Sequence, residues 1–268
     1  MYLYKYRSFT LDNLVSLKEN KIWFSRGVNF NDPFDCTMNV PITLMSLDTV
    51  RDFIINKTSA RNLLNTGLVD MSFIDSVTEQ ELMKARNLIN ENKFSEHPLE
   101  PILSLVSQVL IKSFVCCFSK VSTNHLLWSH YADSHSGFCI RFRKDVLLKN
   151  LNIINHGDVI YNDVPINIMH GFNEKENIAK DIIFKKSSSW GYEKEFRMIH
   201  SEFAESDNDR FRVECYPDDA IDCIIFGFNS SDSNVSLVKS IMQGNNLIYK
   251  KITRGANSFE LYVDTEKY

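Results

Sequence analysis

The sequence predicts an α+β fold built on a mixed or antiparallel sheet that carries a helical insertion. Short alternating or apolar runs, such as residues 2–6 and 223–228, indicate strands. Between residues 47 and 112, apolar residues instead recur at helical spacing. Strands and helices follow one another in no regular alternation, which favours α+β over a doubly wound sheet. We therefore expect a single domain over residues 1–268, with residues 47–112 as a helical insertion or lid.

Composition limits the class of protein. The 268 residues are 44% hydrophobic, which suffices for one sizeable core. The formal net charge is -4, so the chain as a whole offers no positive field for nucleic acid. The N-terminus lacks an apolar run of signal-peptide length, and no stretch of about 18 uncharged apolar residues occurs. We expect a cytoplasmic protein without a membrane partner, whose six cysteines, with no C-x-x-C pair among them, stay reduced.

The N-terminal segment predicts two strands joined by a helix. Residues 2–6 alternate as a strand, residues 10–20 form a helix that Thr10 can cap, and residues 21–25 form a second strand. The loop over residues 26–36 mixes polar turn-formers with two phenylalanines. Such a mixture predicts an ordered loop.

Residues 114–142 concentrate aromatic, histidine, cysteine and serine side chains, and we expect the chemistry of the protein here. The pattern predicts a strand, a helix and a strand, over residues 114–118, 124–132 and 137–142. Ser119 ends the first of these strands. Two strands tied by a short helix would bring Ser119 near His130, Tyr131 and His135 at an edge of the sheet, where ligand sites form.

The rest of the chain continues the mixture of elements. Residues 187–199 pass from a serine-rich turn into an alternating strand. We expect further helices over residues 145–150, 173–186 and 233–244, and further strands over residues 152–154, 158–161, 211–215, 223–228, 247–252 and 259–263.

Glu193 and Glu195 are the strongest candidates for catalytic carboxylates. They are two residues apart on the strand expected near residues 193–199, so both side chains should lie on one face. Two such carboxylates repel when both are ionised, which would raise the pKa of one of them. The alternative is a solvated strand face, on which the glutamates pair with Arg197 or a neighbouring lysine.

Other polar groups have a functional and a structural interpretation. Arg7 and Arg26 each follow a short strand and could bind phosphate groups, or could form surface ion pairs. The three histidines of the central segment are five residues apart, so they cannot share a helix face as zinc ligands, and we expect no metal. Cys117 could act as a nucleophile, although a buried thiol is the common state of a strand cysteine. The signatures of P-loop, dinucleotide-binding, serine-hydrolase and zinc-protease sites are absent from the sequence.

Four motifs resemble a large bacterial family of unknown function that is often found near anti-phage and toxin genes. They are LYKYRSF, VNFNDPFD, the block CFS followed by LLWSHYADSHSGFCI, and WGYEKEFR. Their order is similar to that of the ADP-ribosyltransferase superfamily. In that superfamily a basic or His residue ends the first strand, an aromatic-Ser motif ends a later strand, and a glutamate lies on a further strand, often as Glu-x-Glu.

The resemblance implies a role for each matching residue. Arg7 would take the first position and hold the diphosphate of NAD, Phe118 and Ser119 would take the second, and Glu195 the third, with Glu193 two residues before it. A carboxylate beneath the ribose would stabilise the cation that develops when the nicotinamide bond breaks. The remaining candidates for the cofactor-binding pocket are Arg26, Asn31, Asp32, His130 and Tyr131.

The resemblance therefore predicts an ADP-ribosyltransferase-like enzyme with NAD as its substrate. The acceptor of ADP-ribose would be a protein or a nucleic acid, and an antitoxin or defence-system protein is a candidate partner. Two alternatives stay open at this point. One is a non-catalytic sensor that binds a nucleotide, and the other is a metal-dependent hydrolase or nuclease that uses the same carboxylates.

Overall fold

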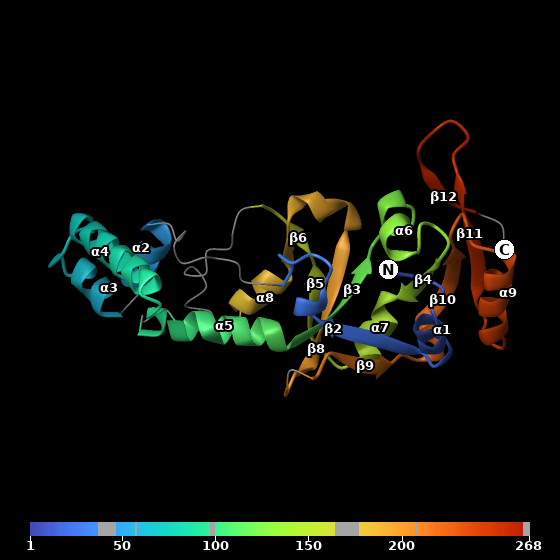
Figure 1. Cartoon of the computed structure of the whole chain (residues 1–268), viewed down its shortest axis with the longest axis horizontal. Helices are drawn as coiled ribbons and strands as arrows, with labels where there is room; N and C mark the ends of the chain where they lie inside the picture. Colours follow the sequence, from blue (N-terminus) through green and yellow to red (C-terminus); the bar gives the residue numbers. More distant parts are fainter. Residues whose placement is uncertain (37–46, 57, 97–99, 164–176, 207, 265–268) are drawn as a thin grey trace. The chain divides into compact units, whose positions relative to one another are not determined.

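The computed structural model describes residues 1–36, 47–56, 58–96, 100–163, 177–206 and 208–264 (Figure 1). The chain divides into two compact units. The first unit comprises residues 1–29, 113–161 and 186–268, and the second comprises residues 30–112 and 162–185. The secondary structure is mixed α and β, as the sequence predicts, with the sheet in the first unit. Each unit is considered by itself below.

The first unit is built on a sheet of ten strands. Most neighbouring strands are antiparallel, and the pair β10–β11 is parallel. The strands of this sheet are β1 (Tyr2–Arg7), β2 (Lys21–Arg26), β3 (Ser113–Ser119), β4 (Phe138–Arg143), β5 (Ile153–Asp158), β8 (Glu195–Phe203), β9 (Phe211–Cys215), β10 (Ile221–Phe226), β11 (Ile248–Arg254) and β12 (Leu261–Val263). A separate two-stranded sheet pairs β6 (Ile160–Tyr161) with β7 (Lys185–Lys186).

The sheet branches at β3. One edge of β3 pairs with β8 along most of its length, from Ser113 to Ser119. The other edge is shared, because Phe114 and Val115 pair with β2 whereas Ser119 alone pairs with β1. From that branch point β1 continues into β4, β10, β11 and β12, and β2 continues into β9. The strands β1 and β2 therefore diverge from each other on the same side of β3.

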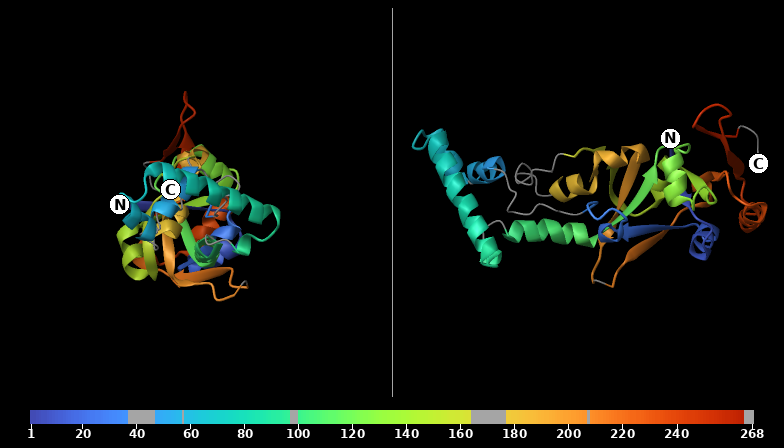
Figure 2. Two further views of the ribbon diagram at one scale, coloured as in Figure 1. Left: turned by 90° about the vertical axis from the view of Figure 1, so that its left-hand side faces the viewer. Right: turned by 45° about the horizontal axis from the view of Figure 1, so that its top comes forward.

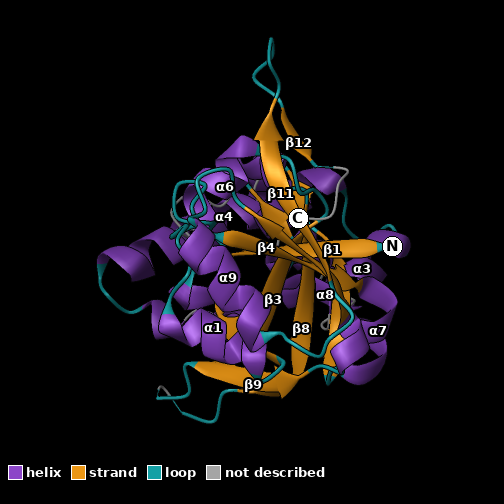
Figure 3. Cartoon of the chain, turned by 90° about the vertical axis from the view of Figure 1, so that its right-hand side faces the viewer, coloured by secondary structure: helices purple, strands orange, loops and turns teal. Residues whose placement is uncertain are grey.

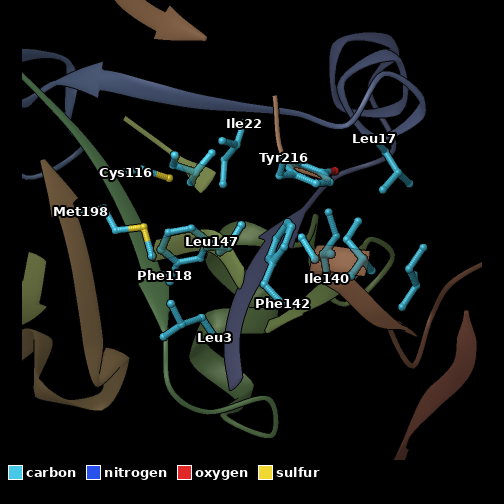
Figure 4. Close-up of a cluster of buried hydrophobic side chains, with 14 of the residues drawn as sticks. Leu3, Leu17, Ile22, Cys116, Phe118, Ile140, Phe142, Leu147, Met198 and Tyr216 are labelled. Atoms are coloured by element: carbon cyan, nitrogen blue, oxygen red, sulfur yellow. The ribbon is translucent and has the colours of Figure 1, made fainter. Parts of the chain in front are cut away.

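Helices cover both faces of this sheet (Figure 3). One face packs against α1 (Leu11–Lys18), α7 (Lys144–Asn150) and α9 (Asp232–Ile241), and forms a large core (Figure 4). The opposite face packs against α6 (His125–Tyr131), whose Trp128 is fully buried beside Tyr6 with ring centroids 5.1 Å apart. We call these the large-core face and the α6 face. Strand alternation assigns the side chains, since Leu3 lies in the large core and Tyr6 in the α6 cluster.

Local signals account for several of these elements. The Thr10 side chain accepts a hydrogen bond from the backbone of Asn13 and begins α1, and Asn124 begins α6 in the same way. The predicted strands at both ends of the chain and the predicted strand-helix-strand segment are confirmed within a few residues. Apolar alternation and capping residues thus predict most of the first unit.

The segment before β8 corrects one prediction. Glu193 does not lie on the strand, because residues Ser188–Glu193 form a 3-10 helix, η5, and Lys194 adopts a left-handed conformation with φ 45°. The Ser187 side chain begins this turn by accepting from the backbone of Ser189. Strand β8 starts only at Glu195, so Glu193 and Glu195 do not share a strand face. The expected helix over residues 173–186 is also shorter: α8 spans Asn177–Ile183, and residues 173–176 lie outside the described part.

The second unit is helical in the part that the structure describes (Figure 2). Apolar side chains of α2, α3 and α4, among them Val50, Ile54, Ile74 and Leu82, form a small core of their own. Its helices are α2 (Leu47–Asn56), α3 (Thr58–Asn65), α4 (Met71–Asn90), α5 (Glu100–Lys112) and α8 (Asn177–Ile183). Within the described ranges, none of the helices is both long and apolar enough to cross a membrane.

Candidate functional site

Four charged side chains are buried together where β8 begins, in the first unit. They are Lys186, Glu193, Glu195 and Arg197, and each has a relative exposure of 6% or less. Two carboxylates meet two cations, so their formal charges cancel. Charged side chains are seldom buried unless they are paired, and a group of four is a candidate functional site. We call it the carboxylate cluster.

Glu195 and Arg197 form one half of the cluster. Both lie on the α6 face of β8, because Phe196 and Met198, which alternate with them, lie in the large core. Arg197 is fully buried and donates two hydrogen bonds to Glu195, from Nε to Oε1 at 3.1 Å and from an Nη to Oε2 at 2.8 Å. This two-pronged contact fixes the orientation of the Glu195 carboxylate.

Glu193 and Lys186 form the other half. The ammonium of Lys186 lies 2.8 Å from Oε2 of Glu193 and 3.8 Å from Oε2 of Glu195, so it bridges the two carboxylates. The hydroxyl of Tyr131, at the end of α6, donates to Oε1 of Glu193 at 2.7 Å. The backbone carbonyl of Glu193 accepts from the Ser119 hydroxyl at 2.7 Å. A contact across 74 residues of sequence thus holds the turn that places Glu193.

The pKa of the Glu193 carboxyl is raised from its ordinary value. Burial is the main cause, because it disfavours the charged form. The Lys186 ammonium and the hydrogen bond from Tyr131 act in the opposite direction, and the charge of Glu195 adds a smaller rise. Repulsion between the two glutamates, the cause that the sequence suggests, is therefore the lesser one.

Aromatic side chains surround the cluster. The Lys186 ammonium lies 4.5 Å from the ring centroid of Trp190, and the Tyr161 hydroxyl accepts a hydrogen bond from the backbone of Glu195 at 2.8 Å. The Tyr192 hydroxyl lies 3.2 Å from Nδ1 of His130. His130 is exposed, and Trp190, Tyr192 and Tyr161 are partly exposed. Aromatic rings therefore reach solvent beside the buried charges.

The thiol of Cys117 lies on the same face of β3 as Ser119. Burial raises its pKa well above the ordinary value, and the Glu195 carboxylate raises it further. A thiol in this state stays protonated, which does not favour Cys117 as a nucleophile.

The structure brings together four of the residues that the sequence singles out. Glu193, Glu195, Ser119 and Tyr131 lie within the cluster or hydrogen-bond to it, and His130 reaches its edge through Tyr192. Ser119 and Glu195 are direct partners on neighbouring strands. Their predicted roles stay predictions, but their proximity is a fact of the fold.

Three other candidates lie on the large-core face. Phe118 belongs to the large core, with its ring against Phe142 at 5.9 Å. Arg7 lies on the same side of β1 as Leu3, and Arg26 on the same side of β2 as the core residue Phe24. The sheet therefore separates these three side chains from the carboxylate cluster. The predicted roles of Arg7, Arg26 and Phe118 in binding a cofactor stay predictions.

Asn31 and Asp32 belong to the second unit. Asn31 is exposed, and the Asp32 carboxylate accepts a hydrogen bond from the backbone of Phe34 at 2.9 Å, as in a turn that aspartate stabilises. This hydrogen bond gives Asp32 a local structural role in the turn. The predicted binding role of the two residues stays a prediction.

Sequence reasoning missed several members of the site. The sequence indicates Lys186 only as an unnamed lysine near the glutamates, and Arg197 only as a surface partner. The signal for Arg197 was available, because it follows Glu195 by two residues and shares its face of the strand. Tyr4 is the β1 residue directly opposite Ser119, so Tyr4, Ser119 and Glu195 form a row across three strands. Tyr2, Tyr4 and Tyr6 alternate along β1, so the sequence predicts that Tyr4 shares one face of the strand with Tyr6.

Metal binding finds no support in the described residues, among which no group of three or more His, Cys, Asp or Glu side chains is arranged to hold an ion. The chemistry present is a pair of carboxylates whose charges are compensated, with phenol and indole groups around them. Such a set can stabilise a positive charge on a ligand, or hold a ring against its aromatic side chains.

Comparison with known proteins finds a similarity over part of the chain. Residues 127–198 match a family described as a protein of unknown function, DUF2971. The match contains Tyr131 and all four charged residues of the carboxylate cluster. The motifs LYKYRSF and VNFNDPFD lie outside it. No curated protein and no solved structure matches the chain.

Proposed function

We propose that the protein cleaves NAD at the carboxylate cluster and transfers ADP-ribose to an acceptor. The observation that carries the proposal is the pairing of Ser119 with Glu195. Ser119 ends β3, Glu195 begins β8, and the two residues are direct partners across the strands. The resemblance to ADP-ribosyltransferases assigns both residues to one NAD site, and their proximity supports that assignment.

Glu195 is the catalytic carboxylate in this proposal. Cleavage of the nicotinamide bond leaves positive charge on the ribose, and a fixed carboxylate stabilises that charge where it develops. The two hydrogen bonds from Arg197 hold Glu195 in one orientation, so little reorganisation accompanies the reaction. Glu193 lies beside it, held by Lys186 and Tyr131, and in this proposal is the second catalytic carboxylate.

A non-catalytic nucleotide sensor is the second candidate, and a specific observation favours it. Lys186 and Arg197 compensate both carboxylates, and Glu193 and Glu195 are only 4% and 5% exposed. A compensated and covered carboxylate serves to shape a site more readily than to meet a substrate. In this case the partly exposed aromatic side chains would hold the ligand without turnover.

Nicotinamide release separates the two candidates. The full-length protein is incubated with NAD and cell lysate, and released nicotinamide is followed by mass spectrometry. Glu195→Gln keeps the shape of the side chain and removes its charge, so we expect release to fall by about a hundredfold or more. Asp158→Asn is the matched control, because Asp158 is an exposed carboxylate of the same sheet that pairs with Lys120.

The outcomes are distinct. Release that depends on Glu195 but not on Asp158 supports the transferase, whereas equal release from wild type and Glu195→Gln contradicts it. Absence of release together with stabilisation of the protein by NAD in a thermal melt supports the sensor. Circular dichroism of each variant shows whether the substitution has disturbed folding.

Labelling with an NAD analogue identifies the acceptor. Biotin-tagged NAD is added to lysate, and labelled protein and nucleic acid are collected separately. A toxin or anti-phage effector would modify a cellular or phage component rather than only itself. Co-expression with neighbouring genes would reveal an antitoxin, since an inhibitory partner abolishes the labelling.

A further inference from the structure

A strand with an unpaired edge ends one branch of the sheet in the first unit. Among the described strands, β9 pairs with β2 and with no other (Figure 3). The pairing keeps one register, from Phe211 opposite Ser25 to Cys215 opposite Lys21. We call the side of Phe211–Cys215 that points away from β2 the β9 edge. An exposed edge of this kind is a template for pairing with a further strand.

The hydrogen bonds between β9 and β2 show which backbone groups lie on the β9 edge. Tyr216 follows the strand, and its N–H donates to the Asn20 carbonyl at 2.9 Å. Arg210 precedes the strand, and its carbonyl accepts from the N–H of Arg26 at 3.4 Å. Hydrogen-bonded pairs alternate along an antiparallel ladder, so the even-numbered residues of β9 bond to β2. The residues whose N–H and C=O groups point away from β2 are Phe211, Val213 and Cys215.

The side chains of the same three residues form an exposed apolar row. Trp23 lies opposite Val213, and its neighbour Phe24 lies in the large core, so the row is on the other face of the sheet. Phe211 and Val213 are 45% and 39% exposed, and Cys215 is exposed as well. The Trp23 ring supports the row, with its centroid 4.4 Å from that of Phe211.

The β9 edge differs from the free edge of β5, which pairs with β8 alone among the described strands. The pairing of β5 shifts in register between Ile153 and Asn155, and Asp158 presents an exposed carboxylate. Bulges and exposed charges hinder pairing with a further strand. Over its described length, Phe211–Cys215, β9 contains no proline and no bulge. Its edge is therefore open to another strand.

The charges of β9 favour a second copy of the same strand as the partner. Arg212 and Glu214 lie on either side of Val213. When two β9 strands pair antiparallel about Val213, Arg212 of each copy lies directly opposite Glu214 of the other. Opposite charges in such positions stabilise a sheet, whereas like charges destabilise it. In the same register Phe211 lies opposite Cys215 of the second copy, and the Val213 residues of the two copies exchange both backbone hydrogen bonds.

Contacts within one chain already orient these charged side chains. Arg212 donates to the carboxylate of Glu202 at 3.1 Å and to the outward carbonyl of Phe211 at 3.4 Å. A carbonyl oxygen can accept two hydrogen bonds, so Phe211 can still pair with another strand. Nε2 of His200 lies 2.8 Å from Oε1 of Glu214. Side chains that are held in place lose little freedom when a second copy binds.

We propose that two copies of the protein associate through their β9 edges, antiparallel and with a two-fold axis at Val213. Such an interface uses the same patch on both copies, which is the commonest symmetry of homodimers. It joins the two sheets into one and brings the exposed apolar rows of the two copies side by side. The proposal does not rest on the proposed NAD cleavage.

Sedimentation equilibrium of the full-length protein measures the association. One chain has a mass of 31.1 kDa, and we expect wild type to approach twice this mass as its concentration rises. One strand edge buries little surface, so the dilution series runs from about 1 μM to about 1 mM. Val213→Lys places two ammonium groups at the two-fold axis and should raise the dissociation constant at least about tenfold. Ile154→Lys is the matched control, because Ile154 is a 61% exposed apolar residue on the edge strand β5.

A disulfide tests the register of the two strands. Phe211→Cys places a thiol opposite Cys215 of the second copy, where the two Cα atoms would lie about 5.5 Å apart, within the range for a disulfide. Within one chain the same two positions are about 13 Å apart, which is too far for a bond. We expect oxidation with copper phenanthroline to give a covalent dimer on a non-reducing gel. Phe211→Cys combined with Cys215→Ser is the control and should give none.

Each outcome supports or overturns the proposal. A dimer that Val213→Lys weakens and Ile154→Lys retains supports it, and so does a crosslink that requires Cys215. A wild type that is monomeric throughout the dilution series overturns it and would leave the β9 edge to a strand of another protein. A dimer that Val213→Lys does not weaken also overturns it. If circular dichroism shows that Val213→Lys does not fold, the crosslink decides, and its persistence in the Cys215→Ser control contradicts the register.

Discussion

The two faces of the sheet differ in how their cations are compensated. On the α6 face, Lys186 and Arg197 meet Glu193 and Glu195 at 2.8 Å, and the charges cancel. On the large-core face, Arg7 has no acidic partner among the described residues. The first arrangement is compensated within the protein, whereas Arg7 is partly exposed to solvent. The two faces therefore differ in how the charge of a cation is compensated.

Replacement of Arg197 should have the largest effect on stability. Arg197→Met leaves Glu195 buried without its two hydrogen bonds, and loss of one partner of a buried pair costs about 3–5 kcal/mol. Lys186, at 3.8 Å, compensates only partly. Urea unfolding measures the change.

Arg141→Met is the control for this prediction. Arg141 makes the same two-pronged contact with Asp222, at 2.9 and 3.0 Å, but its side chain is 20% exposed. We expect a smaller loss there, because water can reach the carboxylate that remains. Equal losses for the two variants would show that burial does not set the energy of the Glu195–Arg197 pair.

The hydrogen bond from Tyr131 should contribute an intermediate amount. Tyr131→Phe removes the hydroxyl that donates to Glu193 at 2.7 Å, and a hydrogen bond to a charged group is worth about 1.5–3 kcal/mol. The substitution should also raise the pKa of Glu193 further, since that hydrogen bond lowers it. Tyr6→Phe is a suitable comparison, because its hydroxyl donates to a neutral carbonyl, that of Val121, at 2.8 Å. A loss no greater than that of Tyr6→Phe would mean that Glu193 is neutral in the folded protein.

The titration of Glu193 predicts a dependence of stability on pH. The folded pKa of Glu193 is raised, so the folded state holds its proton to a higher pH than the unfolded chain, in which the pKa is about 4.3. The contribution of this group to stability is full below the unfolded pKa. It is lost as the pH rises through the folded pKa, by about 1.4 kcal/mol for each unit between the two values.

Glu193→Gln isolates that contribution. The difference in free energy of unfolding between Glu193→Gln and wild type should change in favour of the variant as the pH increases from about 4 to neutrality. Glu202→Gln serves as the control, because Glu202 is an exposed carboxylate that pairs with Arg212 on the same sheet. A difference that is constant with pH would mean that the folded and unfolded states share one pKa.

Much of the first unit could be predicted because its signals are local. Alternating apolar residues mark β1 and β4, and Thr10 and Asn124 mark the first turns of their helices. These residues act on neighbours three or fewer positions away. Distant contacts are not needed to recognise them.

The site could be predicted only in part because its geometry depends on distant contacts. Glu193 reaches its position through the left-handed conformation of Lys194 and the hydrogen bond from Ser119, which is 74 residues away. A Glu-x-Glu pattern is equally compatible with a strand and with a turn that leads into one. Lys186 is the last residue of β7, and the residues next to it in the sequence do not indicate that it contacts the two glutamates.

Arg7 shows a different limit. Alternation along β1 assigns Arg7 to the side of Leu3 and Lys5, away from Tyr4 and Tyr6, and this could be read from the sequence. The motif order alone joined Arg7 to Glu195. The face of the sheet on which Glu195 lies depends on where β8 begins. The sequence does not show that residue, because a turn with a strand-like pattern precedes β8.

The smallest expected effect is the most informative test of the comparison. Arg7→Met makes the same change as Arg197→Met, on the other face of the sheet. We expect the free energy of unfolding to be unchanged or raised by about 1 kcal/mol, since an apolar side chain replaces a partly exposed cation whose guanidinium has no hydrogen-bond acceptor among the described residues.

A loss of about 3–5 kcal/mol for Arg7→Met would instead mean that Arg7 has an internal partner, and the two faces would not differ. The pair Arg7→Met and Arg197→Met, measured in the same buffer, therefore separates a cation that the fold does not need from one that completes the fold.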